Sequence, residues 1–157
     1  MGSKCRLIMI IGILLLIALF LILFNGSLRP KNVDYVEELF SVFEEQETTT
    51  VDSIFPFDFE CAYIFNDCYI SGEGLAERYN LNISISQVET GTSENIQRIV
   101  FVDKNGSFVY EFKCDSNKIV ILDKGMIIYP ETIIKKKSSA SNTPLTLQFE
   151  SLEYYDS

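Results

Sequence analysis

The chain has 157 residues, with 13 lysines and arginines against 22 aspartates and glutamates, which gives a formal net charge of −9. A field of this sign repels nucleic acid, so no nucleic-acid partner is expected. The sequence has no histidine, which excludes Ser-His-Asp and Cys-His catalysis and histidine-ligated zinc.

An apolar segment runs from Leu7 to Phe24 and contains no charge, no proline and one glycine, Gly12. At about 1.5 Å per residue, such a helix approaches the hydrocarbon thickness of a bilayer. The segment is longer than the core of a signal peptide, and the residues after it match a cleavage site poorly. We therefore expect a permanent single-pass transmembrane anchor over residues 7–24.

The basic residues that flank this anchor predict its orientation. Lys4 and Arg6 precede the apolar segment together with the terminal amine, and Arg29 and Lys31 follow it. Positive charge is enriched on the cytoplasmic side of membrane segments. The small bias places the tail 1–6 in the cytoplasm. A linker 25–33, a domain 34–152 and a tail 153–157 then follow on the extracytoplasmic side of the cell membrane.

The first half of the domain predicts two short helices and a strand. Asp34 and Glu37 form a capping box for a helix over residues 34–46, in which apolar residues recur at helical spacing. Residues 48–52 indicate a loop. Alternation over residues 57–65 predicts a strand whose inward face is formed by Phe57, Phe59, Cys61, Tyr63 and Phe65. A helix over residues 73–79 is expected to end at Asn80 in a left-handed conformation.

The second half predicts mainly antiparallel strands. Residues 82–88 alternate, and the runs 96–102 and 107–112 flank Asn105-Gly106, which is typical of a hairpin with a type I′ turn. Further predictions are a hairpin of 118–122 with 126–129, a solvated basic loop at 135–137, a strand at 145–149 and a frayed tail. The expected fold is α+β, an antiparallel sheet of five to seven strands covered by one or two short helices.

The densest polar and aromatic neighbourhood is formed by Asp58, Glu60, Tyr63, Asp67 and Tyr69. Asp58 and Glu60 share one face of the predicted strand, a spacing that suits a divalent cation or paired acid–base chemistry. Alternating acids on an outer strand face are, however, most often simply solvated. We therefore expect these residues to form an interaction surface, and we expect no catalytic residue, no bound metal and no cofactor.

These observations favour a membrane-anchored, extracytoplasmic binding module without catalytic activity, which acts on an unidentified protein partner. One alternative is a metal-binding or enzymatic domain that uses Asp58, Glu60 and Asp67. Another is a subunit of a membrane complex that acts through its segment 7–24. The cysteines leave two readings open: Cys61 and Cys68 form a disulfide in an oxidising compartment, or the cysteines of the domain are free thiols.

A group of short motifs resembles a known class of proteins. The motifs are the run 57–60, the strand residues 63–65 with Tyr69, and the run 99–103 before Gly106. They are similar to those of small, uncharacterised bacterial proteins anchored by a membrane segment or a lipid. Phe59 replaces an expected tryptophan, and Cys68 replaces an expected proline. The resemblance implies an extracytoplasmic α+β domain and brings no activity with it.

Overall fold

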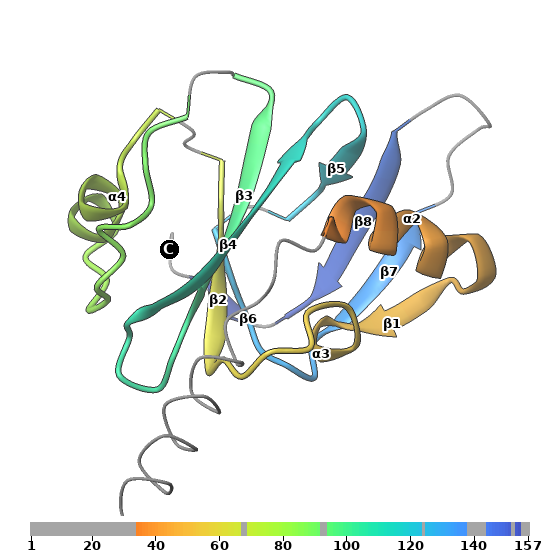
Figure 1. Cartoon of the computed structure of the whole chain (residues 1–157), viewed down its shortest axis with the longest axis horizontal. Helices are drawn as coiled ribbons and strands as arrows, with labels where there is room; N and C mark the ends of the chain where they lie inside the picture. Colours follow the sequence, from red (N-terminus) through yellow and green to blue (C-terminus); the bar gives the residue numbers. More distant parts are fainter. Residues whose placement is uncertain are drawn as a thin grey trace, which may run out of the picture. The chain divides into compact units, whose positions relative to one another are not determined.

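Two β-sheets and a few short helices make up the part of the chain that the structure, a computed structural model, describes (Figure 1). The described residues are 34–66, 69–91, 94–123, 125–137, 144–151 and 153–154. The helices are α2 (Tyr35–Glu45), α3 (Val51–Ile54) and α4 (Gly72–Arg78). The strands are β1 (Thr48–Thr50), β2 (Cys61–Phe65), β3 (Ile96–Val102), β4 (Phe108–Asp115), β5 (Ile119–Ile121), β6 (Met126–Ile128), β7 (Ile133–Lys137), β8 (Leu145–Glu150) and β9 (Glu153–Tyr154). The domain is therefore a small α+β domain.

The strands divide between two sheets, whereas the sequence predicted one. A five-stranded sheet has the order β4-β3-β2-β6-β9, and all of its neighbours are antiparallel. A four-stranded sheet has the order β1-β7-β8-β5, and its β5 and β8 are parallel. The predicted hairpin of 118–122 with 126–129 is wrong, because β5 belongs to the four-stranded sheet and β6 to the five-stranded one.

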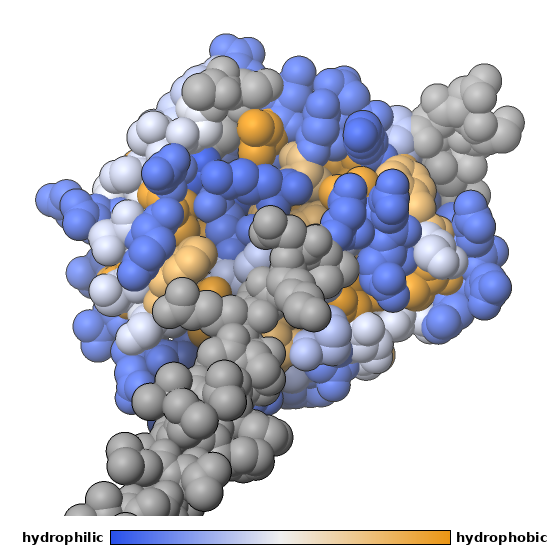
Figure 2. All heavy atoms as spheres, viewed as in Figure 1, coloured by the Kyte–Doolittle hydropathy of each residue, from blue (hydrophilic) through white to orange (hydrophobic). Residues whose placement is uncertain are grey.

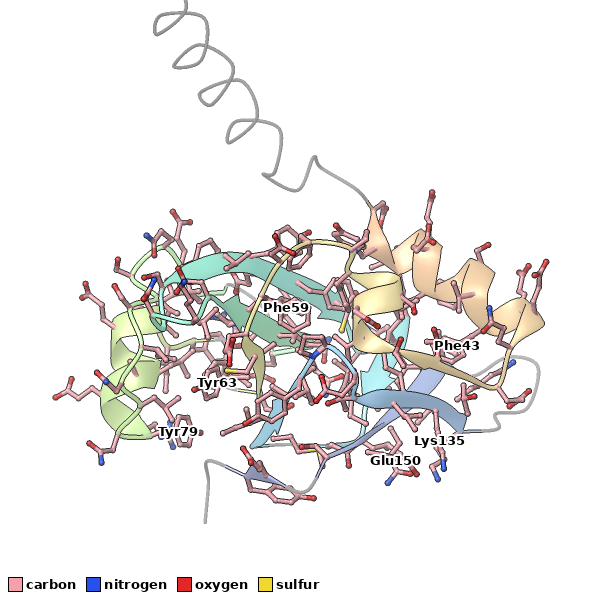
Figure 3. The ribbon with its side chains drawn as sticks, turned by 90° about the horizontal axis from the view of Figure 1, so that it is seen from below. Phe43, Phe59, Tyr63, Tyr79, Lys135 and Glu150 are labelled. Atoms are coloured by element: carbon pink, nitrogen blue, oxygen red, sulfur yellow. The ribbon has the colours of Figure 1, made fainter. Side chains whose placement is uncertain are left out.

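The five-stranded sheet is covered by apolar residues on both faces. Ala62 and Ile64 of β2 belong to the main core, which also includes residues of α2, α3 and both sheets. Phe65 faces a second core with Leu75 of α4, and Cys61 and Tyr63 pack against this second core. The predicted strand 57–65 is shorter in the structure, because β2 begins at Cys61, and Phe57 and Phe59 of its predicted inward face pack against the main core instead. The opposite face of β2 is also buried, which an alternating pattern with one wet face does not predict. In Figure 3, Phe43 and Tyr63 lie in these two separate regions.

Two of the predicted helices are confirmed. Asp34 caps α2 by accepting a hydrogen bond from the N–H of Val36 (3.1 Å). Leu39 and Phe43 of α2 are buried, whereas Phe40, on the predicted apolar stripe, is 39% exposed. In α4 the chain leaves the helix through Asn80, whose φ of 52° is the predicted left-handed conformation.

The hairpin of β3 and β4 is confirmed, but its turn is not of type I′. Among the described residues only Asn80 and two glycines have positive φ, so Asn105 lacks the positive φ that a type I′ turn requires. The N–H of Gly106 donates to the carbonyl of Asp103 (2.8 Å), and Gly106 alone has the positive φ of 73°. This is the three-residue loop in which the glycine forms a bulge.

Four further predictions are corrected. Residues 48–52, expected as a loop, form β1 and the start of α3. Residues 82–88 form no strand and contribute only an isolated bridge between Ser84 and Ser107. The lysines 135–137 lie in β7, and residues 153–154 of the expected frayed tail pair with β6 as β9.

The basic strand β7 is explained by the partners of its lysines. The Nζ of Lys136 donates to the carbonyl of Phe43 (2.8 Å) in the last turn of α2, where a helix lacks backbone donors. Lys135 forms an ion pair with Glu150 of β8, and Figure 3 shows the two side chains together. Two of the three lysines of β7 therefore have acceptors on neighbouring elements, which accounts for their place in a strand instead of a solvated loop.

The predicted anchor, including Leu7, Gly12 and Phe24, lies outside the described residues, as do Asp67 and Cys68. Within the described residues, no helix has the length and apolar character needed to cross a membrane. Figure 2 shows one face of the domain, on which hydrophilic side chains predominate and apolar ones show between them.

Candidate functional site

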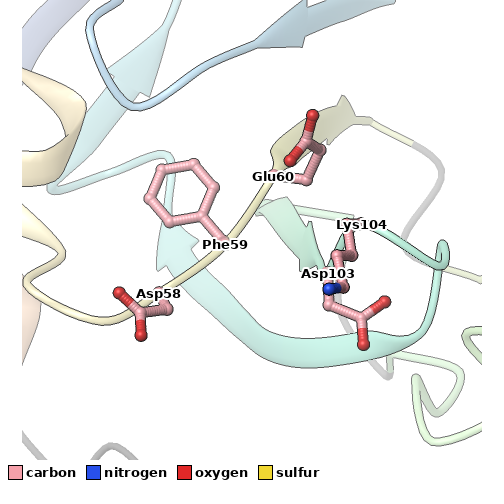
Figure 4. Close-up of a pocket in the computed structure, with 5 residues that line it drawn as sticks. All are labelled: Asp58, Phe59, Glu60, Asp103 and Lys104. Atoms are coloured by element: carbon pink, nitrogen blue, oxygen red, sulfur yellow. The ribbon is translucent and has the colours of Figure 1, made fainter.

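A pocket of about 250 Å³ lies between the segment that leads into β2 and the turn that joins β3 to β4 (Figure 4). Its lining residues are Asp58, Phe59, Glu60, Asp103 and Lys104, and we call it the Phe59 pocket. Two of the five predicted interaction residues, Asp58 and Glu60, therefore lie at one pocket.

Strand pairing places the two halves of the Phe59 pocket beside each other. Cys61 of β2 is opposite Val102 of β3, and the N–H of Glu60 donates to the carbonyl of Val102 (2.8 Å). The residue that precedes β2 therefore lies next to the residue that follows β3, which is Asp103. The pocket is thus assembled by a contact between strands that are distant in sequence.

The aromatic wall of the pocket is held by other aromatic rings. Phe59 packs edge-to-face on Phe101, with ring centroids 4.9 Å apart, and lies 5.8 Å from the ring of Phe57. Phe101 is fully buried in the main core. Such edge-to-face pairs are favourable because the positive edge of one ring meets the negative face of the other. The position of Phe59 is therefore fixed by the core beneath it.

The acidic turn of the pocket is also rigid. The Oδ1 of Asp103 accepts hydrogen bonds from the N–H groups of Asn105 (2.8 Å) and Ser107 (2.9 Å). These bonds, to Ser107 and then Asn105, lower the pKa of the Asp103 carboxyl below its ordinary value, because they stabilise the charged form. Asp103 therefore presents a fixed negative charge to the pocket.

The pocket does not have the arrangement of a metal site. In Figure 4 the carboxylates of Asp58, Glu60 and Asp103 point in different directions instead of toward one point. In the part of the chain that the structure describes, no group of three or more metal-ligating side chains is close enough to hold an ion. The predicted third acid of the metal hypothesis, Asp67, lies outside the described residues.

Tyr63 and Tyr69, which were also predicted as interaction residues, do not line the Phe59 pocket. Tyr63 packs against the second core, and burial together with the neighbouring Cys61 raises its pKa to about 12. Tyr69 lies just before α4 and is 55% exposed. Of the four predicted interaction residues that the structure describes, Asp58 and Glu60 line this pocket and Tyr63 and Tyr69 do not.

Cys61 has a free thiol in the structure. Burial raises the pKa of this thiol, although the hydrogen bond with Tyr63 acts in the opposite direction. Cys68 lies outside the described residues, so its pairing with Cys61 stays a prediction. Cys114 is also free and is buried in the main core.

A second pocket, of about 350 Å³, lies where β6 leads into β7 and β8 into β9. Its lining residues are Tyr129, Glu131, Thr132, Ile133, Glu150, Ser151 and Glu153. The hydroxyl of Tyr129 donates to Glu153, and this bond is the main cause that raises the pKa of Tyr129 to about 12. This pocket was not predicted from the sequence, because residues 153–157 were expected to form a frayed tail.

The sequence analysis also missed a buried arginine in β3. Arg98 is fully buried, and its Nη1 donates to the carbonyls of Ile70 (3.3 Å) and Glu89 (3.2 Å). Its Nε lies 3.6 Å from the Oε1 of Glu111, and the Nζ of Lys113 lies 3.1 Å from the Oε2 of the same carboxylate. The available signal was one charged residue in a run, Ile96 to Val102, that is apolar apart from Gln97 and Arg98, because arginine is seldom buried without partners.

Comparisons with protein-family models, with curated protein sequences and with solved structures find no match to this chain.

Proposed function

We propose that this chain is a membrane-tethered, extracytoplasmic binding module without catalytic activity, and that its Phe59 pocket receives a cationic side chain of a protein partner. The observation that carries the proposal is the lining of the pocket, which is shared by three carboxylates, of Asp58, Glu60 and Asp103, and by Phe59. A cation is attracted both by carboxylates and by the face of an aromatic ring.

The volume of the Phe59 pocket favours a side chain of a protein partner over a small-molecule metabolite as its ligand. Its volume is about 250 Å³, whereas sites for small-molecule ligands enclose roughly 300–1,000 Å³. Lys104 lies at the same pocket and can pair with a carboxylate of the partner. A partner that carries a projecting lysine or arginine near an acid therefore fits this lining.

The absence of histidine from the sequence supports a function in binding, because histidine supplies most general acid–base catalysis near neutral pH. The tether is supported by the apolar segment 7–24 of the sequence. Tethering raises the effective concentration of a weak site relative to a partner in the same membrane.

The proposal is tested by titrating the full chain, in detergent micelles, with a capped Gly-Gly-Arg-Gly-Gly peptide while recording amide NMR spectra. We expect saturable shifts at Glu60, Asp103 and Lys104, with a dissociation constant on the order of 1 mM. The same peptide with glutamine in place of arginine should cause no shifts.

A pair of matched variants separates the pocket from general acidity. Asp58→Asn with Glu60→Gln should abolish the shifts. Glu44→Gln with Glu45→Gln removes the same charge from exposed positions of α2 and should leave them unchanged. If both variants lost the amide shifts to the same extent, peptide binding would depend only on net charge, and the proposed site would be wrong.

A further inference from the structure

The outer edge of the five-stranded sheet is formed by β4, which is the longest strand among the described residues. The other described edges are short: β1 and β5 in the four-stranded sheet have 3 residues each, and β9 has 2. The edge of β5 is also occupied, because its Ile121 hydrogen-bonds the side chain of Gln97. An exposed edge is a template for a further strand.

The register of the hairpin determines which backbone groups of β4 point outward. The N–H of Ser116 donates to the carbonyl of Asn95 (2.7 Å), so this pair is hydrogen-bonded. Hydrogen-bonded and non-hydrogen-bonded pairs alternate in an antiparallel ladder. Since Ser116 is in a hydrogen-bonded pair, every second residue before it is in one as well. The residues between them, Glu111, Lys113 and Asp115, therefore direct their N–H and C=O groups away from β3.

One end of this edge is closed. The N–H of Phe108 points outward as well, but it donates to the carbonyl of Ser84 (3.0 Å), and a bulge follows at Val109. Within the described residues, no partner is found for the outward N–H groups of Glu111 and Lys113. The free edge therefore runs from Val109 to Asp115.

We propose that this edge pairs with the same edge of a second copy of the chain, antiparallel, with Glu111 of each copy opposite Lys113 of the other. A two-fold contact of this kind is self-complementary and closed. In this register, the outward N–H and C=O groups of Glu111 and Lys113 in one copy lie opposite those of Lys113 and Glu111 in the other, as hydrogen-bonded pairs require. Glu111 already contacts Lys113 (3.1 Å) and Arg98 (3.6 Å) of its own chain, and the proposed register places the lysine of the other copy beside the same carboxylate.

The charges of β4 select this register over its neighbours. A shift that places Glu111 opposite Glu111, or Lys113 opposite Lys113, sets like charges against each other, which is unfavourable. A shift that pairs Lys113 with Asp115 is complementary, but its overlap is confined to residues 113–115. The proposed register alone combines opposite charges with overlap along 109–115.

The test measures self-association of the full chain in detergent micelles by analytical ultracentrifugation, with hydrogen exchange of the backbone amides. The expected result is a reversible dimer, in which the amides of Glu111 and Lys113 become more protected as protein concentration rises. This proposal does not rest on the Phe59 pocket, so the peptide titration and the dimer measurement can fail separately.

Three variants locate the contact. Lys113→Pro removes an outward N–H that the monomer does not use, which an edge strand tolerates, and should abolish dimerisation while the amides of β2 and β3 stay protected. Lys113→Glu should weaken association about tenfold, since two attractive pairs become repulsive. Lys137→Glu makes the same charge change at an exposed position of β7 and should have no effect.

Cysteine cross-linking tests the register. A mixture of Glu111→Cys and Lys113→Cys chains should form a disulfide between copies, because opposite residues of a hydrogen-bonded pair have Cα atoms about 5.5 Å apart. Either variant alone should form less of this product. A monomer at all concentrations, a dimer that Lys113→Pro leaves intact, or pairing only with a strand of another protein would overturn the proposal.

Discussion

The side-chain amide of Gln97 in β3 makes two hydrogen bonds with the backbone of Ile121 in β5, like those that a neighbouring strand would make. Its Nε2 donates to the carbonyl of Ile121 (3.0 Å), and its Oε1 accepts from the N–H of the same residue (2.8 Å). The same Nε2 also donates to Asn66 (3.2 Å). One glutamine thereby links the edge of the four-stranded sheet to the five-stranded sheet.

Replacing Gln97 by leucine should destabilise the domain by about 2 to 4 kcal/mol, because two backbone groups of a buried residue lose their partners. Ile121 is 1% exposed, so water cannot replace the amide without opening the sheet junction. Urea unfolding followed by circular dichroism measures the change. Gln87→Leu alters an exposed glutamine in the same way and should change stability by less than about 0.5 kcal/mol.

Arg98→Met should destabilise the domain by about 3 to 5 kcal/mol, the usual result of removing one member of a buried ion pair. The variant leaves the largely buried Glu111 with Lys113 as its remaining cationic partner and removes the donor to the carbonyls of Ile70 and Glu89. Ile70 precedes α4, and Glu89 follows the segment 81–88, which packs against α4 in the second core. If the variant accelerates hydrogen exchange in α4 more than in α2, relative to the parent chain, the loss of stability is local to the second core. An equal acceleration in both helices would contradict the role of Arg98 in holding this core.

Gly106→Ala should destabilise the domain by about 1 to 3 kcal/mol. Gly106 has a φ of 73°, and an added Cβ would lie 2.8 Å from the carbonyl oxygen of Asn82, so a side chain brings both backbone strain and a clash with backbone. Thermal unfolding gives the change. A neutral result would mean that the turn between β3 and β4 adapts at no cost.

Alkaline pH should weaken the fold through Tyr63. The pKa of Tyr63 is raised from 10.0 to about 12, first by burial and then by Cys61. Its neutral form is favoured in the folded chain, so this stabilisation is complete below pH 10 and is lost as the pH rises from 10 to about 12. Urea unfolding at pH 9, 10 and 11 should show a smaller decline for Tyr63→Phe than for the parent chain. Tyr154→Phe, at a position 52% exposed, should decline like the parent chain.

Local signals in the sequence predicted much of the secondary structure. Asp34 as a helix cap, Asn80 as a helix end and the glycine turn at Gly106 each act within a few residues, so a sequence pattern captures them. The two-sheet arrangement escaped prediction because it depends on contacts such as Gln97 with Ile121, between residues far apart in the chain.

The same distinction applies to the site. Asp58 and Glu60 were predicted because they are close in sequence. Asp103 and Lys104 were interpreted only as a turn, because the register of β2 against β3 brings them to the pocket. Tyr63 packs against the second core, in agreement with its predicted inward position, and its role in an interaction surface stays a prediction.

Photo-cross-linking in intact cells tests the central claim, that the Phe59 pocket holds a cationic side chain of a protein partner. The full chain carries a benzophenone amino acid in place of Phe59, and adducts are identified by mass spectrometry. We expect one discrete adduct, joined near a lysine or arginine of the partner, that disappears with Asp58→Asn and Glu60→Gln and persists with Glu44→Gln and Glu45→Gln. The same label in place of Ser86, which is exposed, should give no such adduct. The absence of an adduct at Phe59, or an adduct unaffected by loss of both acids, would contradict the proposed function.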